Sequence, residues 1–251
     1  MKRKMTGIVI IGFLLIATFY LMAHINRAKD TIHYTALGDS IAAGVGASEN
    51  HGYTDLLNQH FRGIYKTVDY ANVAQSGDTS GDLLKKLEES DTVRKAVKKA
   101  DVITICIGGN DLLSGAGQLL DGDFSSLSDQ ISGFQKNWGT ILAAIREINP
   151  LAEIYAMDLY NPISVGDVYG GVRCDRELWE VIDGNIRKLN NVITSRDNQN
   201  KYKYRTAEVY AAFQQYEKQG QRLTGFAKDS DPHPTDEGHR MIFNQYRELE
   251  G

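Results

Sequence analysis

The stretch YTALGDS, residues 34–40, is an apolar run that stops abruptly at Gly38-Asp39-Ser40. Its composition predicts a strand, and the glycine predicts a turn after it. A strand that ends in such a turn presents a serine hydroxyl for nucleophilic attack. Near the other end of the chain, DPHP at residues 231–234 places a histidine between two prolines, just before a predicted final helix. A serine needs such a base because its free hydroxyl is barely nucleophilic.

Strand-like and helix-like segments alternate outward from this stretch. Five segments predict strands: 32–37, 67–73, 101–107, 152–159 and 202–210. Helical patterns lie between and after them: 53–61, 83–87 (opened by Ser80-Gly81-Asp82), 128–148, 177–193 and 237–250. Alternation of this kind predicts an α/β fold in which helices cover both faces of a parallel sheet. The longest predicted loops, 114–127 and 161–176, follow strand ends, where ligands bind in open sheets.

Four short polar motifs follow the predicted strands. They are GDS at 38–40, AQSGDT at 74–79, GGND at 108–111 and DPH at 231–233. Because the carboxyl ends of parallel strands meet at one edge, we expect all four motifs to gather there. Acyl transfer needs a nucleophile, a base and donors for the developing oxyanion. Ser40 and His233 could supply the first two, and the Gly77 backbone N–H and the Asn110 amide could supply the donors.

In this order and spacing, the four motifs resemble those of the SGNH, or GDSL, family of esterases and lipases, and its exported lysophospholipase-like bacterial members. The resemblance covers about residues 32–250. It implies that Ser40 is the nucleophile, that its own N–H joins Gly77 and Asn110 in the oxyanion hole, and that His233 is the base. It also implies a flavodoxin-like three-layer α/β/α sandwich with a five-stranded parallel sheet, an acyl ester as substrate, and neither metal nor organic cofactor.

The third member of the catalytic triad departs from the family pattern. The family usually places an aspartate three residues before the histidine, where this chain has Ser230. Acidic residues stand at Asp229 and Asp231 instead. Pro232 favours an extended Asp231, and side chains two residues apart in an extended segment point to the same side. We therefore prefer Asp231 as the partner of His233, over Asp229 or a backbone carbonyl.

Other polar and sulfur-containing side chains have structural interpretations. Asp39 and Asp111 are expected to tie loops together, and His239 is expected on the surface of the last helix. Cys106 lies in an apolar run and is interpreted as a small buried hydrophobe, whereas Cys174 lies in a polar loop. A disulfide between them is not expected. Cysteines and histidines also lack the spacing of a metal site.

The N-terminal segment differs from the rest of the chain. Residues 1–28 begin with a basic MKRK, and residues 5–25 are apolar and about long enough to span a bilayer. We interpret them as a signal peptide or, by preference, an uncleaved anchor. Residues 29–251 then form one exported hydrolase domain, which we expect to be monomeric and to meet the membrane through the N-terminal segment alone.

The charge of the exported part excludes a nucleic-acid partner. Residues 1–28 hold four of the 28 Lys and Arg and none of the 32 Asp and Glu, which leaves a net charge near −8. Nucleic-acid binding requires the opposite sign.

Other functions compete with the esterase hypothesis. The Gly-x-Ser-x-Gly pattern of α/β-hydrolases is absent around Ser40, and so is a dinucleotide or P-loop motif. A wall-binding protein of the same fold would be expected to lose Ser40 or His233. A deacetylase or O-acetyltransferase acting on cell-wall polysaccharide stays an alternative to an esterase for lipid-like or short acyl groups. Three aromatic residues are candidate acyl or sugar platforms: Tyr160, Tyr169 and Trp179.

Overall fold

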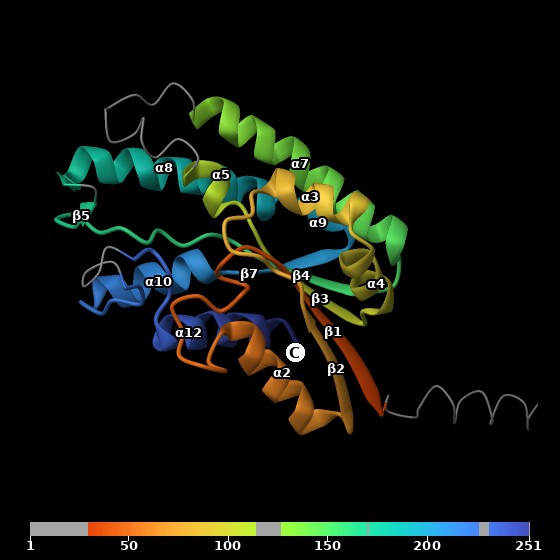
Figure 1. Cartoon of the computed structure of the whole chain (residues 1–251). Coiled ribbons are helices and arrows are strands. Elements are labelled where there is room, and N and C mark those ends of the chain that lie inside the picture. Colours follow the sequence, from red (N-terminus) through yellow and green to blue (C-terminus); the bar gives the residue numbers. More distant parts are fainter. Residues whose placement is uncertain (1–29, 114–126, 170, 226–230, 251) are drawn as a thin grey trace, which may run out of the picture.

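The computed structural model describes residues 30–113, 127–169, 171–225 and 231–250 (Figure 1). The predicted signal peptide or anchor at 1–28 lies outside these ranges, as does Asp229. Within the described ranges, no helix combines the length and the apolar character that a membrane crossing requires.

Five parallel strands form the central sheet, in the order β2-β1-β3-β4-β7. Their bounds are β1 (Thr31–Gly38), β2 (Thr67–Asn72), β3 (Val102–Cys106), β4 (Glu153–Met157) and β7 (Tyr204–Ala207). Every neighbouring pair is parallel, as the alternation of strands and helices predicted. The strand order is that of a flavodoxin-like sheet, which confirms the predicted fold class.

Helices cover both faces of the sheet, in three layers (Figure 1). One face carries α3 (Ser80–Glu89), α4 (Asp91–Lys99), α5 (Gly109–Leu113), α7 (Leu127–Ile148), α8 (Arg176–Ile193) and α9 (Arg196–Tyr202). The other face carries α2 (Tyr53–Ile64), α10 (Val209–Lys218) and α12 (Asp236–Arg247), which the short 3₁₀ helix η1 (Glu248–Glu250) follows.

Two apolar cores result, because successive strand residues point to opposite faces. On β3, Ile103 and Ile105 pack into the core beneath α3, α7 and α8. Val102 and Cys106 pack into the core on the side of α2 and α12. The central strands are therefore apolar on both faces, as buried parallel strands require.

The structure departs from the predicted elements around the last strand. The predicted strand 202–210 is only β7, since α9 ends at Tyr202 and α10 begins at Val209. Ser195 caps α9 through its side chain, and the Arg146 guanidinium binds the carbonyl oxygens of Tyr202 and Lys203, at 2.6 and 2.5 Å. A tertiary contact from α7 thus helps to fix where α9 ends and β7 begins.

Further elements, α5 among them, were not predicted. Ser90 ends α3 and also caps α4, so two short helices stand where we expected one. Within the predicted loop 161–176, β5 (Val168–Tyr169) and β6 (Val172–Arg173) form a small antiparallel hairpin.

The strand order reverses between β1 and β3, and ligands bind at this point in such folds. Gly38 ends β1 with a φ of +140°, and a Cβ there would lie 1.9 Å from the carbonyl oxygen of Cys106. Only glycine allows this close approach. The turn carries Ser40 to the carboxyl edge of the sheet, beside the loop that follows β3.

Candidate active site

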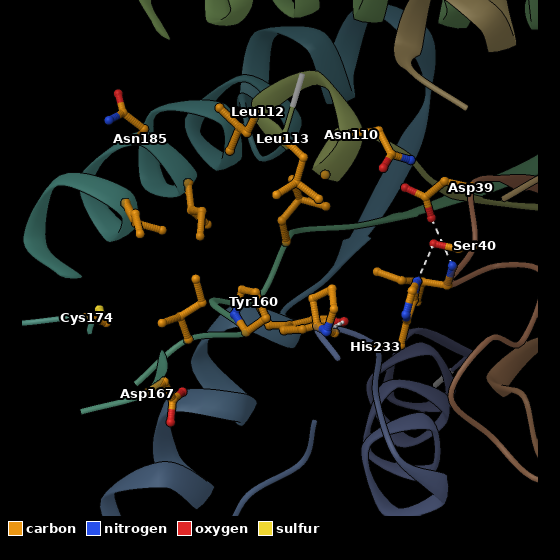
Figure 2. Close-up of a pocket in the computed structure, with 18 of the residues that line it drawn as sticks. Asp39, Ser40, Asn110, Leu112, Leu113, Tyr160, Asp167, Cys174, Asn185 and His233 are labelled. Carbon is orange, nitrogen blue, oxygen red and sulfur yellow. Dashed lines mark hydrogen bonds between the residues drawn. The ribbon is translucent and has the colours of Figure 1, made fainter. Parts of the chain in front are cut away.

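Ser40 and His233 meet at the carboxyl edge of the sheet, although 193 residues separate them (Figure 2). The distance from His233 Nε2 to Ser40 Oγ is 2.8 Å, which is a hydrogen bond. Ser40 comes from the turn after β1, and His233 from the loop before α12. This is the geometry in which a ring nitrogen takes the proton of an attacking hydroxyl.

Asp231 occupies the other side of the histidine ring. Its Oδ1 lies 2.5 Å from His233 Nδ1 and also accepts the backbone N–H of His233 at 3.1 Å. Its side chain is 40% exposed, against 25% for that of His233. Of the carboxylates considered from sequence, the structure brings Asp231 to the ring, while Asp229 lies outside the described residues.

Backbone contacts hold the histidine loop in place. The Tyr160 hydroxyl donates to the carbonyl oxygen of Pro232 at 2.9 Å, and Gly225 N–H donates to that of His233 at 3.0 Å. Thr235 N–H, at the start of α12, donates to the carbonyl oxygen of Leu223 at 2.8 Å. Two other parts of the chain, Tyr160 and residues 223–225, therefore hold the segment that carries the imidazole.

Asp39 stabilises the turn that carries Ser40. It is buried, and its Oδ1 accepts the N–H of Ile41 at 3.0 Å, while its own N–H donates to the carbonyl oxygen of Cys106 at 3.1 Å. Burial raises the pKa of Asp39 to about 7. These contacts agree with the structural role predicted for Asp39.

The predicted oxyanion donors lie on neighbouring loops that are bound to each other. The Asn110 amide, in the first turn of α5, donates to the carbonyl oxygen of Asp78 at 2.9 Å. Gly77 precedes Asp78 in an exposed turn with a φ of +88°. Asn110 lines the pocket beside Ser40, whereas Gly77 does not. Asp111 binds both the N–H and the hydroxyl of Ser80, so it is a loop staple, as predicted.

A largely apolar pocket of about 230 Å³ opens beside Ser40 (Figure 2). Its walls come from α5, α8, the segment after β4 and the hairpin. The apolar lining is Ile41, Leu112, Leu113, Leu127, Leu159, Tyr160, Pro162, Ile163, Val172, Cys174, Leu178, Ile182, Ile186 and Pro232. An engineered apolar cavity of roughly 150 Å³ stays dry and binds benzene, so this pocket has room for more than one small apolar group.

The end of the pocket remote from Ser40 is formed by Cys174 and Asp167 (Figure 2). Asp167 Oδ2 lies 2.6 Å from the Arg222 guanidinium and accepts the N–H of Ser164 at 2.7 Å. Asp167 is thus paired and hydrogen-bonded, which lowers the cost of its burial. Cys174 is buried with a free thiol, as is Cys106, in agreement with the expected absence of a disulfide.

Sequence reasoning missed most of this pocket and misplaced some residues. Trp179 lines a separate open hollow beside α10, not the Ser40 pocket, and its indole N–H donates to the carbonyl oxygen of Ile163. Tyr160 lines the Ser40 pocket, and the side chain of Tyr169 lies outside the described part of the structure. His239 is fully buried, so its predicted surface position is wrong. The available signal for the pocket was the apolar face of the predicted helix 177–193.

Comparison with known proteins gives consistent results. The model of the GDSL-like lipase/acylhydrolase family matches residues 36–241. The chain is 35% identical over 149 residues to an uncharacterised protein of Bacillus subtilis, YpmR, and 34% identical over 139 residues to the spore germination lipase LipC of Bacillus licheniformis. These matches cover 57% and 53% of this chain, but only 56% and 65% of the two relatives.

A solved structure matches over more of the chain. The lipase Lip_vut3 from a goat rumen metagenome superimposes with a TM-score of 0.63 and 27% identity. The match covers 86% of this chain and 96% of that lipase.

Proposed function

The chain belongs to the GDSL-like lipase/acylhydrolase family, and from that premise we propose that it is a serine esterase that hydrolyses carboxylic esters with lipid-like, apolar acyl groups. Ser40 Oγ attacks the ester carbonyl while His233 Nε2 takes its proton. Asp231 stabilises the imidazolium that forms. The alcohol leaves with that proton, and water then releases the acyl group from Ser40 by the same route in reverse.

The single observation that carries this proposal is the hydrogen-bonded series Asp231–His233–Ser40 at the mouth of an apolar pocket. The series activates the hydroxyl, and the pocket accepts an apolar group on the same carbonyl. The oxyanion would be held by the N–H groups of Ser40 and Gly77 and by the Asn110 amide. Asn110 supports this role because it lines the pocket beside Ser40.

The size and character of the pocket favour a medium acyl chain over acetate. An apolar chain that leaves water for this pocket gains about 0.8 kcal/mol per buried CH₂. An acetyl group buries one methyl and leaves most of the pocket empty or wet. A polysaccharide deacetylase would gain little binding free energy from this apolar pocket. We therefore prefer an esterase for longer acyl groups.

Turnover of p-nitrophenyl acetate, butyrate, octanoate and palmitate by the full chain in mild detergent tests the proposal. We expect kcat/KM to rise from acetate to octanoate and then to level off or fall. Ser40→Ala should lose at least about 10³-fold on every ester. Turnover confined to acetate would overturn the substrate class, and a wild type inactive on all four esters would overturn the proposed hydrolase.

The placement of the enzyme is part of the same proposal. Residues 1–28 anchor a monomeric domain, residues 29–251, on the outer side of the cell membrane, which the basic start and apolar run of this segment support. Added trypsin should remove the domain from intact protoplasts while a cytoplasmic marker survives. Protection of both proteins would contradict export, and light scattering of the purified chain tests the monomer.

A further inference from the structure

His239 is a fully buried histidine that the catalytic roles above do not use. It lies in the first half of α12, and its ring stacks on Tyr53 with centroids 6.3 Å apart. Burying an imidazole costs free energy unless its nitrogens are hydrogen-bonded. Both nitrogens of His239 have partners, and both partners are backbone groups.

The two partners are of opposite kind, which fixes the state of the ring. Nδ1 lies 3.2 Å from the N–H of Tyr53 and therefore accepts. Nε2 lies 3.0 Å from the carbonyl oxygen of Val45 and therefore donates. Only the neutral Nε2–H tautomer satisfies both contacts, because an imidazolium has no lone pair for the N–H of Tyr53.

These contacts join the two halves of the catalytic pair. Val45 lies in the loop that follows Ser40, and its N–H donates to the carbonyl oxygen of Ser40 at 2.9 Å. His239 lies on the helix that follows His233. A short series of contacts therefore connects Ser40 to Val45, and Val45 to His239. His239 is in turn connected to His233 through α12.

Two further contacts hold the loop after Ser40 against the segment that carries His233 and the start of α12. A Cβ at Gly46 would lie 2.3 Å from the carbonyl oxygen of Pro234 and 2.8 Å from Cβ of His233, so the loop meets the histidine segment at its closest approach. Ser48 donates its N–H and its hydroxyl to Asp236, at 2.6 and 2.7 Å. The hydrogen bonds between Ser48 and Asp236 are exposed to solvent, whereas the one between His239 and Val45 is part-buried, so water shields the contact through His239 less.

We propose that His239 is a positioning residue that, through Val45, fixes Ser40 Oγ within hydrogen-bond distance of His233 Nε2. This inference rests on the proposed function. Without the Nε2–Val45 contact, the loop loses its part-buried connection to α12, and the hydroxyl and the base separate more often. A misplacement of about 1 Å in a catalytic pair can cost 10²-fold in rate.

The positioning contact depends on pH because it needs the neutral ring. Burial lowers the pKa of His239 from its usual value near 6.5, and His233 lowers it further, while Val45, Asp236 and Asp55 act in the opposite direction. Below pH 6.5 the unfolded chain binds a proton at His239 that the folded chain does not bind. The contribution of His239 therefore lowers the free energy of unfolding as the pH falls.

Two substitutions, each of which replaces one ring nitrogen of His239, test the proposal in the full chain. In His239→Gln the amide can reach the position of Nε2 and donate to Val45, whereas in His239→Asn it can replace Nδ1 and accept from Tyr53. Each variant leaves one of the two backbone groups without its partner, so we expect both to lose thermal stability. We expect His239→Asn to lower kcat on p-nitrophenyl butyrate by about 10- to 100-fold with little change in KM, and His239→Gln to stay within about threefold of wild type.

Val97→Ala is the matched control for lost stability, because Val97 is buried on the opposite face of the sheet. It should lower the melting temperature without lowering kcat. Equal kcat values for wild type, His239→Asn and His239→Gln, each corrected for the folded fraction, would overturn the positioning role. An inactive wild type would instead overturn the proposed function. In that case ¹⁵N NMR decides the inference, since His239 must keep the Nε2–H tautomer at pH 6 and a titrating ring would contradict it.

Discussion

The carboxylate of Asp231 lies 2.5 Å from His233 Nδ1, yet 40% of its side chain is exposed. Water screens an exposed carboxylate, so its attraction for the imidazolium is weaker than that of a buried one. The same oxygen also accepts the backbone N–H of His233. Geometry as well as charge therefore links Asp231 to the ring.

Asp231→Asn should lower kcat by about 10²- to 10³-fold, less than the roughly 10⁴-fold seen where the triad aspartate is buried. The amide can offer its N–H₂ to Nδ1 and so favour the tautomer in which Nε2 carries the proton. Ester hydrolysis by the purified variant measures this change. Asp229→Asn is the control and should stay within a few-fold of wild type, and small, equal losses in both variants would mean that neither carboxylate orients His233.

Asp39 has a pH effect opposite in sign to that of His239. Burial raises its pKa from 3.8 to about 7, so between these pH values the folded chain holds a proton that the unfolded chain releases. This group therefore lowers stability as the pH rises from about 4 to 7.

Asp39→Asn keeps an acceptor for the N–H of Ile41 and removes the titration. The difference in melting temperature between variant and wild type should shift in favour of the variant from pH 5 to pH 8. Differential scanning calorimetry at the two pH values measures it. A difference that is independent of pH would show that Asp39 does not titrate in this range.

At the scale of elements, the hairpin β5–β6 and helix α8 form the wall of the apolar pocket that is remote from Ser40. Cys174 joins them, immediately before Asp175, whose side chain caps α8. The same segment is held by the pair of Asp167 and Arg222 at 2.6 Å. The length of apolar group that fits this pocket is therefore set by elements remote from Ser40.

Cys174→Phe should shorten the pocket from its far end. We expect kcat/KM for p-nitrophenyl octanoate to fall by at least about tenfold while that for acetate changes less than about threefold, because the added ring takes the place of the outer acyl carbons. Glu180→Phe, at an exposed position of α8, is the control and should keep the wild-type preference. Parallel losses on both esters would instead show that the substitution disturbs the site as a whole.

At the scale of the whole molecule, a cluster of stabilising hydrogen bonds around Asn149 lies at the edge of the sheet opposite to the edge that carries Ser40. Asn149 follows α7 at the edge remote from Ser40, where β3 and β4 begin. Its buried amide donates to the carbonyl oxygens of Val97 and Ala100, both at 2.8 Å, and accepts the N–H of Ala152 at 3.0 Å. One side chain thus connects α4, α7 and the starts of two strands.

Asn149→Ala should lower the free energy of unfolding by about 2–4 kcal/mol, because it leaves several buried backbone groups without partners. Its kcat below the melting transition should stay at the wild-type value. Urea unfolding and ester hydrolysis measure the two quantities. Leu151→Ala, at a side chain 90% exposed, should change stability by less than about 0.5 kcal/mol. A kcat that falls in proportion to stability in Asn149→Ala would contradict this separation.

The predictable part of this protein is local in sequence. Apolar runs ending in glycine or polar residues identified four of the five strands to within two residues, because strand and turn propensities act over a few residues. They failed between 202 and 210, where Arg146 helps to set the boundary from another helix. The surface position expected for His239 failed for a similar reason, since its partners lie 186 and 194 residues away in the chain.

The sequence by itself determined the parallel sheet, its helical layers and the gathering of Ser40, Asn110 and His233 at one edge, because these follow from the order of strands and from what lies at their ends. The local sequence also favoured Asp231 as the partner of His233, two residues away. Tertiary structure alone decided that α8 and the hairpin enclose an apolar pocket, and that His239 is buried between Tyr53 and Val45. Each of these depends on distances between segments far apart in the chain. Such distances are set by packing, which residue patterns do not encode one segment at a time.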